Sequence, residues 1–326
     1  MKSVSAADKI YLYLDIQEGG SLMARKNILQ PADITEEMVW NILPARAQDS
    51  HKGTFGKVFC VAGSSRFRGA AALCTEGALR SGCGIVTLAT VEPVFASVQP
   101  RLPEAILVSC AQCNDTYNGE WFGGISRSEA QRLRAEMKKD YDAMVIGPGM
   151  GNTPETTALV NSLVSDTDCT VVLDADGLNA VKTLPEPSRA GGIIITPHPG
   201  EMARLCGCSI SDIKRAREAI ALVYAVKNNC VVVLKEHRTL IATPEGRLFR
   251  NTSGNSGLAR GGSGDILAGM IASLSAQGLS DESAAICGVW LHGKAAEKCS
   301  ERKSQTAMLP HDIFDDLGDL MKLHGL

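Results

Sequence analysis

A glycine-rich run that ends in a carboxylate is the part of this sequence best suited to chemistry. Residues 251–269 read NTSGNSGLARGGSGDILAG, and Asp265 opens an apolar segment typical of a helix. Glycine lets backbone N–H groups approach an anion closely, and a helix N-terminus adds about half a positive charge. The run therefore predicts a phosphate site formed by Gly262, Ser263 and Gly264. Asp265 would lie beside that phosphate, where its carboxylate could accept a proton from a hydroxyl group.

A second interpretation of Asp265 is purely structural. An acidic residue in the first turn of a helix stabilises the helix dipole or caps the helix, without any part in catalysis. Four glycines lie between positions 257 and 264, and Ser263 separates two of them. This density of glycine favours the chemical interpretation.

Other polar residues follow apolar runs that are typical of buried strands. Lys235 closes one such run and could bind a phosphate, or could be a solvated lysine at a strand end. Asp174 and Asp176 follow another run and could hold magnesium together with phosphates. The interpretation we favour is that Asp176 caps the next helix and Asp174 supports the site from behind.

The cysteines do not form a recognisable metal site. Cys110 and Cys113 form a single C-x-x-C pair, but no second pair or histidine lies at zinc spacing from it. Cys206 and Cys208 lack such partners too. We therefore expect no metal site built from protein side chains.

Alternating apolar runs and helical segments would position these residues. The expected strands cover residues 57–62, 84–89, 105–109, 142–146, 170–173, 193–196 and 231–235, with a hairpin over 238–242 and 247–250. The expected helices cover residues 69–80, 127–138, 156–164, 211–227, 265–276, 281–299 and 311–323. Continuous apolar strands alternating with helices predict an α/β fold, with a mostly parallel sheet covered on both faces. Ligands of such sheets bind beyond the carboxyl ends of the strands.

The first 50 residues have a different texture from the rest of the chain. We expect residues 1–50 to be an N-terminal leader with short helices, one over 22–28 and one starting near Thr35 and ended by Pro44. Residues 51–326 would form a single large domain.

Composition excludes several classes of protein. The 326 residues carry a net charge of −3, which does not suit nucleic-acid binding. No run of 18 apolar residues occurs, so we expect no membrane span, and the polar residues 1–9 do not suit secretion. Eleven cysteines without a disulfide-like spacing favour a reduced, cytoplasmic location.

Seven ordered motifs make the chain resemble the ADP/ATP-dependent NAD(P)H-hydrate dehydratases, a branch of the ribokinase-like superfamily. They are the glycine-rich run above and HKGTFGKVFCVAGS (51–64), GAA (69–71), LRSGCGIVT (79–87), IGPGMG (146–151), LDADGLN (173–179) and TPHPGEM (196–202). The resemblance covers about residues 35–322 and implies a three-layer α/β/α sandwich.

The resemblance also implies a reaction. Members of the family dehydrate the S-epimer of hydrated NADH or NADPH and restore the cofactor, phosphorylating the ring hydroxyl before phosphate is lost. Bacterial members use ADP and release AMP and phosphate, so ADP as cosubstrate with Mg²⁺ is the expectation here. A homotetramer is implied as well, together with a separate NAD(P)H-hydrate epimerase, because about 50 residues are too few to supply that activity.

Site residues carry over by position within the matching motifs. Asp265 matches the catalytic residue, and it also matches a hydrate-binding position together with Ala70, Gly149 and His198. The positions that match nucleotide-binding residues are Lys235, Glu236, His237, Arg238, Thr239 and Gly264. The family usually has glycine where this chain has Glu236, which puts the local backbone geometry in question.

Two other functions stay open. One is a ribokinase-like kinase for a vitamin precursor, such as a hydroxymethylpyrimidine or hydroxyethylthiazole, which shares the glycine-rich loop and its aspartate. Such kinases generally lack the opening motif at 51–58 together with TPHPGEM. The other is a nucleotide-binding sensor without turnover, against which the intact Asp265 and its glycines argue.

Overall fold

The computed structural model describes residues 30–117, 119–138, 140–165, 167–184 and 191–325. The short helix expected over 22–28 lies outside the described residues. Ten strands form one sheet in the order β1 (Ala32–Asp33), β12 (Leu248–Arg250), β11 (Leu240–Ala242), β10 (Val231–Leu234), β9 (Ile193–Ile195), β8 (Thr170–Leu173), β7 (Ala143–Ile146), β2 (Lys57–Val61), β3 (Ile85–Val91) and β4 (Ile106–Cys110).

The pairing in this sheet is parallel everywhere except at the hairpin. Strand β11 runs antiparallel to both β10 and β12, and all other neighbours are parallel. The central strands are buried along nearly their whole length, for example every residue of β7 and β10. The mostly parallel α/β fold expected from the sequence is confirmed, since continuous apolar strands can be stable only when both faces are covered.

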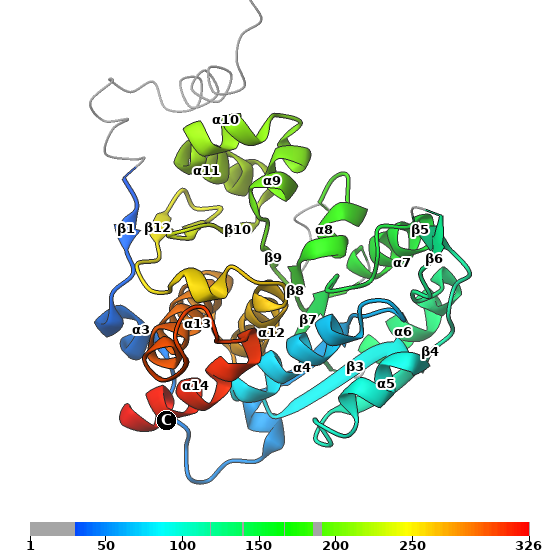
Figure 1. Ribbon diagram of the computed structural model, residues 1–326, viewed down its shortest axis with the longest axis horizontal. Helices are drawn as coiled ribbons and strands as arrows, with labels where there is room; N and C mark the ends of the chain where they lie inside the picture. The colour runs from blue at the N-terminus through cyan, green and yellow to red at the C-terminus, as the bar shows by residue number, and fades with distance from the viewer. Residues whose placement is uncertain (1–29, 118, 139, 166, 185–190, 326) are drawn as a thin grey trace, which may run out of the picture.

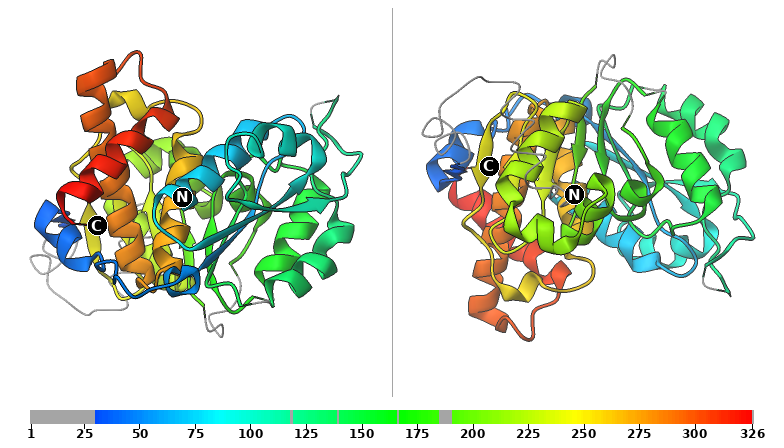
Figure 2. Two further views of the ribbon diagram at one scale, coloured as in Figure 1. Left: turned by 90° about the horizontal axis from the view of Figure 1, so that it is seen from below. Right: turned by 90° about the horizontal axis from the view of Figure 1, so that it is seen from above.

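Helices cover both faces of the sheet (Figures 1 and 2). One layer contains α4 (Arg68–Arg80), α12 (Ser263–Ala276) and α13 (Asp281–Lys303), with α14 (Ile313–Leu323) outside them. The other layer consists of α6 (Ala130–Met137), α7 (Pro154–Val164), α8 (Ala175–Ala180), α9 (Pro199–Cys206), α10 (Ile210–Arg215) and α11 (Arg217–Asn228). The remaining elements include α5 (Glu92–Val98) and a small hairpin of β5 (Thr116–Tyr117) and β6 (Glu120–Trp121).

The end of the expected leader packs on the domain. Strand β1 joins the edge of the sheet, and Ile34 and Val39 are buried in the core. Helix α3 (Glu36–Ile42) starts at Thr35, whose hydroxyl accepts the N–H of Met38 at 3.1 Å. The helix expected at Thr35 is therefore confirmed, whereas strand β1, which has only two residues, was not predicted.

The single helix expected over 211–227 is wrong. Helix α10 ends at Arg215 and α11 begins at Arg217, because Ala216 leaves the helical region (φ −138°, ψ 45°). The two helices pack on different partners: α10 contacts α9, while α11 lies on β10 and β11. The spacing of apolar residues cannot reveal a helix break whose position depends on which elements each helix packs against.

Candidate active site

Four of the expected site residues lie one to three residues after the ends of parallel strands, at one edge of the sheet. Gly149 follows β7, Asp174 follows β8, His198 follows β9 and Lys235 follows β10. The carboxyl ends of neighbouring parallel strands meet at the same edge, which is where ligands of open α/β sheets bind. The N-terminus of α12 meets this edge, since Gly264 lies beside Lys235.

Lys235 and Asp174 form a buried ion pair at the centre of this edge. The Lys235 Nζ lies 2.5 Å from Asp174 Oδ1, and the Asp174 side chain is only 1% exposed. Thr196 Oγ1 donates to the same oxygen at 2.6 Å. Burial by itself lowers the pKa of Lys235, but the charges of Asp174 and Glu201 outweigh it, and the pKa lies above its usual value. Lys235 is therefore a fixed cation rather than a solvated lysine.

Asp176 does not cap helix α8, so that expectation is wrong. Asp174 occupies the N-cap position, and Asp176 lies in the first turn. The Asp176 Oδ2 instead accepts the backbone N–H of Gly151 at 2.7 Å, which ties the loop after β7 to α8. Asp174 supports the site through Lys235, as expected from the sequence.

The turn before α12 has the features of an anion site. Gly262 is the N-cap residue with φ +100°, a conformation that favours glycine. In the described chain, the N–H groups of Gly264 and Asp265 have no acceptor. A Cβ added at Gly264 would lie 3.2 Å from Lys235 Nζ, so open N–H groups and a lysine cation face the same small space. This combination suits a phosphate.

Helix α13 holds the loop that precedes the turn. Ser253 Oγ donates to the carbonyl of Trp290 at 2.9 Å, and Asn255 Nδ2 donates to that of Ala296 at 2.9 Å. The N–H of Gly254 donates to Glu297 Oε1 at 2.9 Å. Because these bonds fix the loop from behind, the N–H groups at the start of α12 are oriented before any ligand arrives.

A cavity of about 580 Å³ opens beside Asp265. Its lining includes Ala70, Gly149 and Asp265, three of the four residues expected to bind the hydrate, together with Gly262 and Asp176. Burial, followed by the nearby charge of Asp174, raises the pKa of Asp265 to about 7. A carboxyl group with this pKa can serve as a proton acceptor near neutral pH.

The remaining wall of this cavity was not found from the sequence. Its lining also includes Arg66, Phe67, Arg68, Leu73 and Phe122. Phe67 and Phe122 have ring centroids 5.6 Å apart, so they form one aromatic wall. Phe122 lies far from the other lining residues in the sequence and belongs to no motif, and only the fold brings it to the site.

His198, the fourth residue expected to bind the hydrate, does not line the cavity. It is the N-cap of α9, where its Nδ1 accepts the N–H of Gly200 at 3.0 Å. Glu201 completes the capping box by accepting the N–H of His198 at 2.8 Å. Partial burial, and then the charge of Lys235, lower the pKa of His198. His198 therefore lies near Lys235 while it caps the helix.

Glu201 is a buried carboxyl group that the sequence analysis did not single out. It is 8% exposed, and burial raises its pKa to about 7 in spite of the opposing charge of Lys235. The TPHPGEM motif contained the signal, since a glutamate three residues after His198 predicts a capping box.

The residues after Lys235 form an exposed turn between β10 and β11. Glu236 pairs with Arg217 of α11, with Nε to Oε2 at 3.0 Å, and Arg217 also donates to the carbonyl of Arg238 at 3.1 Å. Arg238 has φ +57°, and Thr239 Oγ1 donates to the carbonyl of Glu236 at 3.2 Å. The Glu236 side chain thus anchors the turn to α11. His237 is exposed in the same turn.

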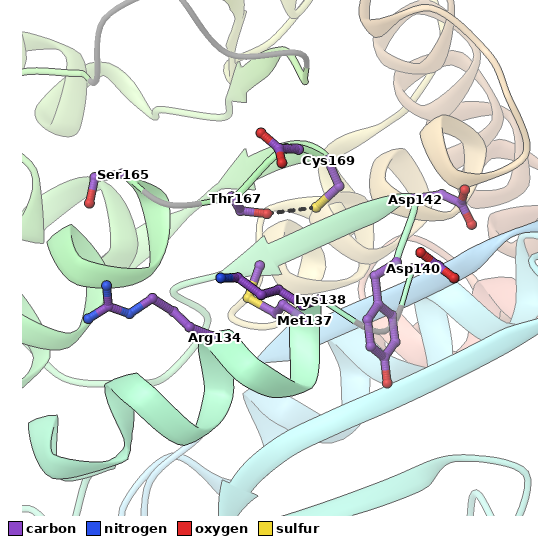
Figure 3. A pocket seen from close by; sticks show the side chains of 10 residues that line it. Arg134, Met137, Lys138, Asp140, Asp142, Ser165, Thr167 and Cys169 are labelled. Carbon is purple, nitrogen blue, oxygen red and sulfur yellow. Dashed lines mark hydrogen bonds between the residues drawn. The ribbon is translucent and has the colours of Figure 1, made fainter.

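A second cavity, of about 710 Å³, lies at the opposite edge of the sheet (Figure 3). It is lined by Arg134, Lys138, Asp140 and Asp142, near the start of β7, and by Cys169, near the start of β8. Figure 3 shows charged side chains of both signs around it, and none of the expected site residues. The edge with the carboxyl ends of the strands is therefore the candidate active site.

Comparisons with known proteins show which family the chain belongs to. Residues 58–318 match the family model of the NAD(P)H-hydrate dehydratases. The chain belongs to this family. It is 37% identical over 288 residues to the ADP-dependent (S)-NAD(P)H-hydrate dehydratase of Bacillus subtilis, covering 88% of this chain and 97% of that one.

Solved structures of family members have the same fold. The ADP/ATP-dependent NAD(P)H-hydrate dehydratase of Bacillus subtilis, co-crystallised with ATP/Mg²⁺, matches with a TM-score of 0.76 and 34% identity, over 90% of this chain and 99% of that chain. A ribokinase-like superfamily protein from Enterococcus faecalis matches with a TM-score of 0.76 and 26% identity, over 90% and 96%. The expected ribokinase-like fold is confirmed.

The chain does not span every relative equally. It covers about half the length of the bifunctional NAD(P)H-hydrate repair enzymes that it matches at 38% identity. In the described part of the chain, no helix is long and apolar enough to cross a membrane.

Proposed function

We propose that this NAD(P)H-hydrate dehydratase family member uses ADP to dehydrate the S-epimer of hydrated NADH and NADPH. The observation that carries the proposal is one continuous arrangement: a cavity for the substrate, Asp265 in its wall, and open N–H groups with Lys235 beside it. A hydroxyl group in the cavity and a phosphate on the turn would then meet at the Asp265 carboxylate.

The proposed first step is a phosphoryl transfer. The ring hydroxyl attacks the terminal phosphorus of ADP, and Asp265 accepts the hydroxyl proton. The bond between that phosphorus and the bridging oxygen breaks, and AMP leaves. The N–H groups of Gly264 and Asp265 and the Lys235 cation stabilise the charge on the transferred group, which is the main source of catalysis in such transfers.

The proposed second step is an elimination. The carbon–oxygen bond of the phosphorylated ring breaks, and phosphate leaves with the electron pair. Loss of a proton from the neighbouring ring carbon restores the double bond of NADH or NADPH. The sum is hydrate plus ADP giving the reduced cofactor, AMP, phosphate and one proton, so atoms and charges balance with no redox change.

The positions expected to bind nucleotide lie around the same turn. Lys235 and Gly264 face the proposed phosphate position. Glu236, His237, Arg238 and Thr239 form the adjoining turn after β10, and we propose that their backbone holds the adenosine phosphate moiety. His198 lies near Lys235, and we propose that it contacts the hydrate.

Magnesium enters the proposal with the nucleotide. The described residues contain no group of three or more histidine, cysteine or acidic side chains that could hold a metal. Asp174, the most buried carboxylate of the site, already binds Lys235 and Thr196. Mg²⁺ typically keeps several waters and binds through substrate phosphates, so we derive no step from a protein-bound metal.

Absorbance at the reduced-nicotinamide band tests the proposed function. The protein is incubated with hydrated NADH or hydrated NADPH, and with ADP or ATP separately. We expect recovery of absorbance with ADP, matched by release of AMP. No recovery with any adenine nucleotide would contradict the proposal. A rise in nucleotide consumption with a hydroxymethylpyrimidine or hydroxyethylthiazole, in place of the hydrate, would support the vitamin-kinase alternative.

The rate should rise with pH and reach half its maximum near pH 7. Below its raised pKa Asp265 is protonated and cannot accept the hydroxyl proton, so kcat/KM should fall about tenfold per pH unit below pH 7. The raised pKa also affects stability. Between about pH 4 and 7 the Asp265 carboxyl keeps its proton in the folded state and has lost it in the unfolded state, so the free energy of unfolding falls as the pH rises through this range.

Glu201 provides the control for this pH profile. Its pKa also lies at about 7, so Glu201→Gln removes the second group that titrates in the same range. We expect the midpoint of kcat/KM to stay near pH 7 in this variant. If the midpoint near pH 7 is lost in Glu201→Gln, the pH profile reports Glu201, and the assignment to Asp265 is contradicted.

Gly149→Ala should block the substrate cavity while leaving the nucleotide site open. Gly149 has φ +64°, and an added Cβ would lie 2.7 Å from the Ala70 Cβ and 2.9 Å from the Phe67 carbonyl oxygen. We expect KM for the hydrate to rise at least tenfold, and the melting shift caused by ADP to stay. Gly246→Ala is the matched control, since Gly246 also has a positive φ (+84°) but has nothing within 4 Å.

The cellular setting is also part of the proposal. We propose a cytoplasmic homotetramer that works with a separate NAD(P)H-hydrate epimerase. The names of the bifunctional NAD(P)H-hydrate repair enzymes among the relatives support the functional link to an epimerase. Light scattering tests the oligomeric state, and a monomer would contradict it.

A further inference from the structure

A buried histidine lies behind the phosphate-binding turn and has no part in the mechanism above. His292 belongs to α13 and is 6% exposed. Its Nε2 is fully covered and has no hydrogen-bond partner in the described chain. A buried polar atom without a partner destabilises the folded state, so it requires an explanation.

Two observations place this histidine at the phosphate-binding turn. His292 makes a polar contact with the backbone of Ser263, the residue between Gly262 and Gly264, and it senses the charge of Lys235. Burial, and then that charge, lower the pKa of His292 to about 4, so the imidazole is neutral at pH 7. A neutral imidazole adds no positive charge that would compete with Lys235 for the phosphate.

The hydroxyl of Ser263 is a second buried group without a partner. Ser263 is 6% exposed, and its Oγ accepts and donates no hydrogen bond among the described residues. Two unpartnered polar atoms, one from the first turn of α12 and one from α13, thus belong to residues that contact each other at the same turn. One buried polar atom without a hydrogen-bond partner can occur by chance. A ligand at the turn that brings both atoms into hydrogen bonds would explain the two together.

We propose that His292 is a positioning residue for the phosphoryl-transfer step, acting through Ser263. With a phosphoryl group on the turn, Ser263 Oγ–H donates to a phosphoryl oxygen, and the neutral His292, in the tautomer that carries its one ring proton on Nε2, donates that N–H to Ser263 Oγ. No proton is transferred in this arrangement; the imidazole orients the hydroxyl and supports the turn. The inference rests on the proposed function, because it assumes that a phosphoryl group occupies the turn.

The test compares three substitutions on the full chain. His292→Leu removes the polar atoms and keeps much of the volume, His292→Gln returns an amide nitrogen near the position of Nε2, and Ser263→Ala removes the hydroxyl. We expect His292→Leu and Ser263→Ala each to lower kcat by about 10²-fold, which is the typical effect of losing one preorganised hydrogen-bond donor. The KM for the hydrate should change little, and the His292→Gln variant should have a kcat close to that of the wild type.

The double variant Ser263→Ala/His292→Leu decides whether the two residues act together. We expect its kcat to be no lower than that of either single variant, since both remove the same interaction. Losses that multiply would overturn the coupling. A Leu variant with wild-type kcat would overturn the positioning role altogether.

Cys287→Ala controls for destabilisation of α13. Cys287 is also fully buried on this helix, but its Sγ faces the carbonyl of Val39 in α3, away from the turn. We expect a lower melting temperature and unchanged kcat. A kcat loss like that of His292→Leu would show that loosening the helix is sufficient, and would overturn the proposal.

A separate measurement keeps the inference testable if the proposed function fails. The melting shift caused by inorganic phosphate is measured for the wild type and for His292→Leu. If the wild type does not convert the hydrate, the proposed function fails. A phosphate shift that is present in the wild type and reduced in His292→Leu would still support the positioning role. Equal shifts would overturn it.

Discussion

Asp265→Asn should abolish turnover and leave the protein folded. The substitution is nearly isosteric, and asparagine is tolerated in the first turn of a helix, so the free energy of unfolding should change little. It removes the carboxylate that would accept the hydroxyl proton, and the loss of a general base typically costs about 10²–10⁴-fold in rate. ADP should still raise the melting temperature, because the N–H groups of the turn and Lys235 remain.

The measurement pairs the dehydratase rate with the melting shift caused by ADP. Asp281→Asn is the matched control, since Asp281 also lies in the first turn of a helix and burial also raises its pKa. It bonds to Thr170 at the opposite end of β8, with Oγ1 to Oδ1 at 3.0 Å, and should keep full activity. Full activity of Asp265→Asn would contradict the mechanism, and an unfolded variant would favour the structural interpretation of Asp265.

Lys235→Met should weaken nucleotide use and destabilise the fold at the same time. Lys235 supplies the cation of the proposed phosphate site, and a charge-assisted contact of this kind contributes about 1.5–3 kcal/mol. That corresponds to a rise of about tenfold or more in KM for ADP. The substitution also leaves Asp174 buried without its partner, which typically costs about 3–5 kcal/mol.

The double variant Lys235→Met/Asp174→Asn separates these two effects. Removing the carboxylate charge should restore much of the lost stability, because no unpaired buried charge remains. KM for ADP should stay high, because the cation is still missing. Thermal unfolding and ADP kinetics are measured on the same samples. An unchanged KM for ADP in both variants would reject the role of Lys235, whatever its effect on stability.

The conformation of the turn before α12 was predictable from the sequence because it depends on neighbouring residues. Gly262 adopts a conformation that favours glycine, and Asp265 lies in the first turn of the helix that follows. Buried parallel strands were equally predictable, since short apolar runs such as 231–234 that alternate with helical segments are typical of a sheet covered on both faces. Both are local properties that a short stretch of sequence specifies by itself.

Contacts between distant residues were decided only by the tertiary structure. Lys235 and Asp174 are 61 residues apart, and they pair because β8 and β10 flank β9 in the sheet. The same packing joins Ala70, Gly149 and Asp265 in one cavity, adds Phe122 to its wall, and brings His292 behind Ser263. The spacing of apolar residues predicts that a segment is buried, but it does not predict which other segment packs on it. The order of strands in the sheet supplies that information, and it therefore determined which charges of this protein meet.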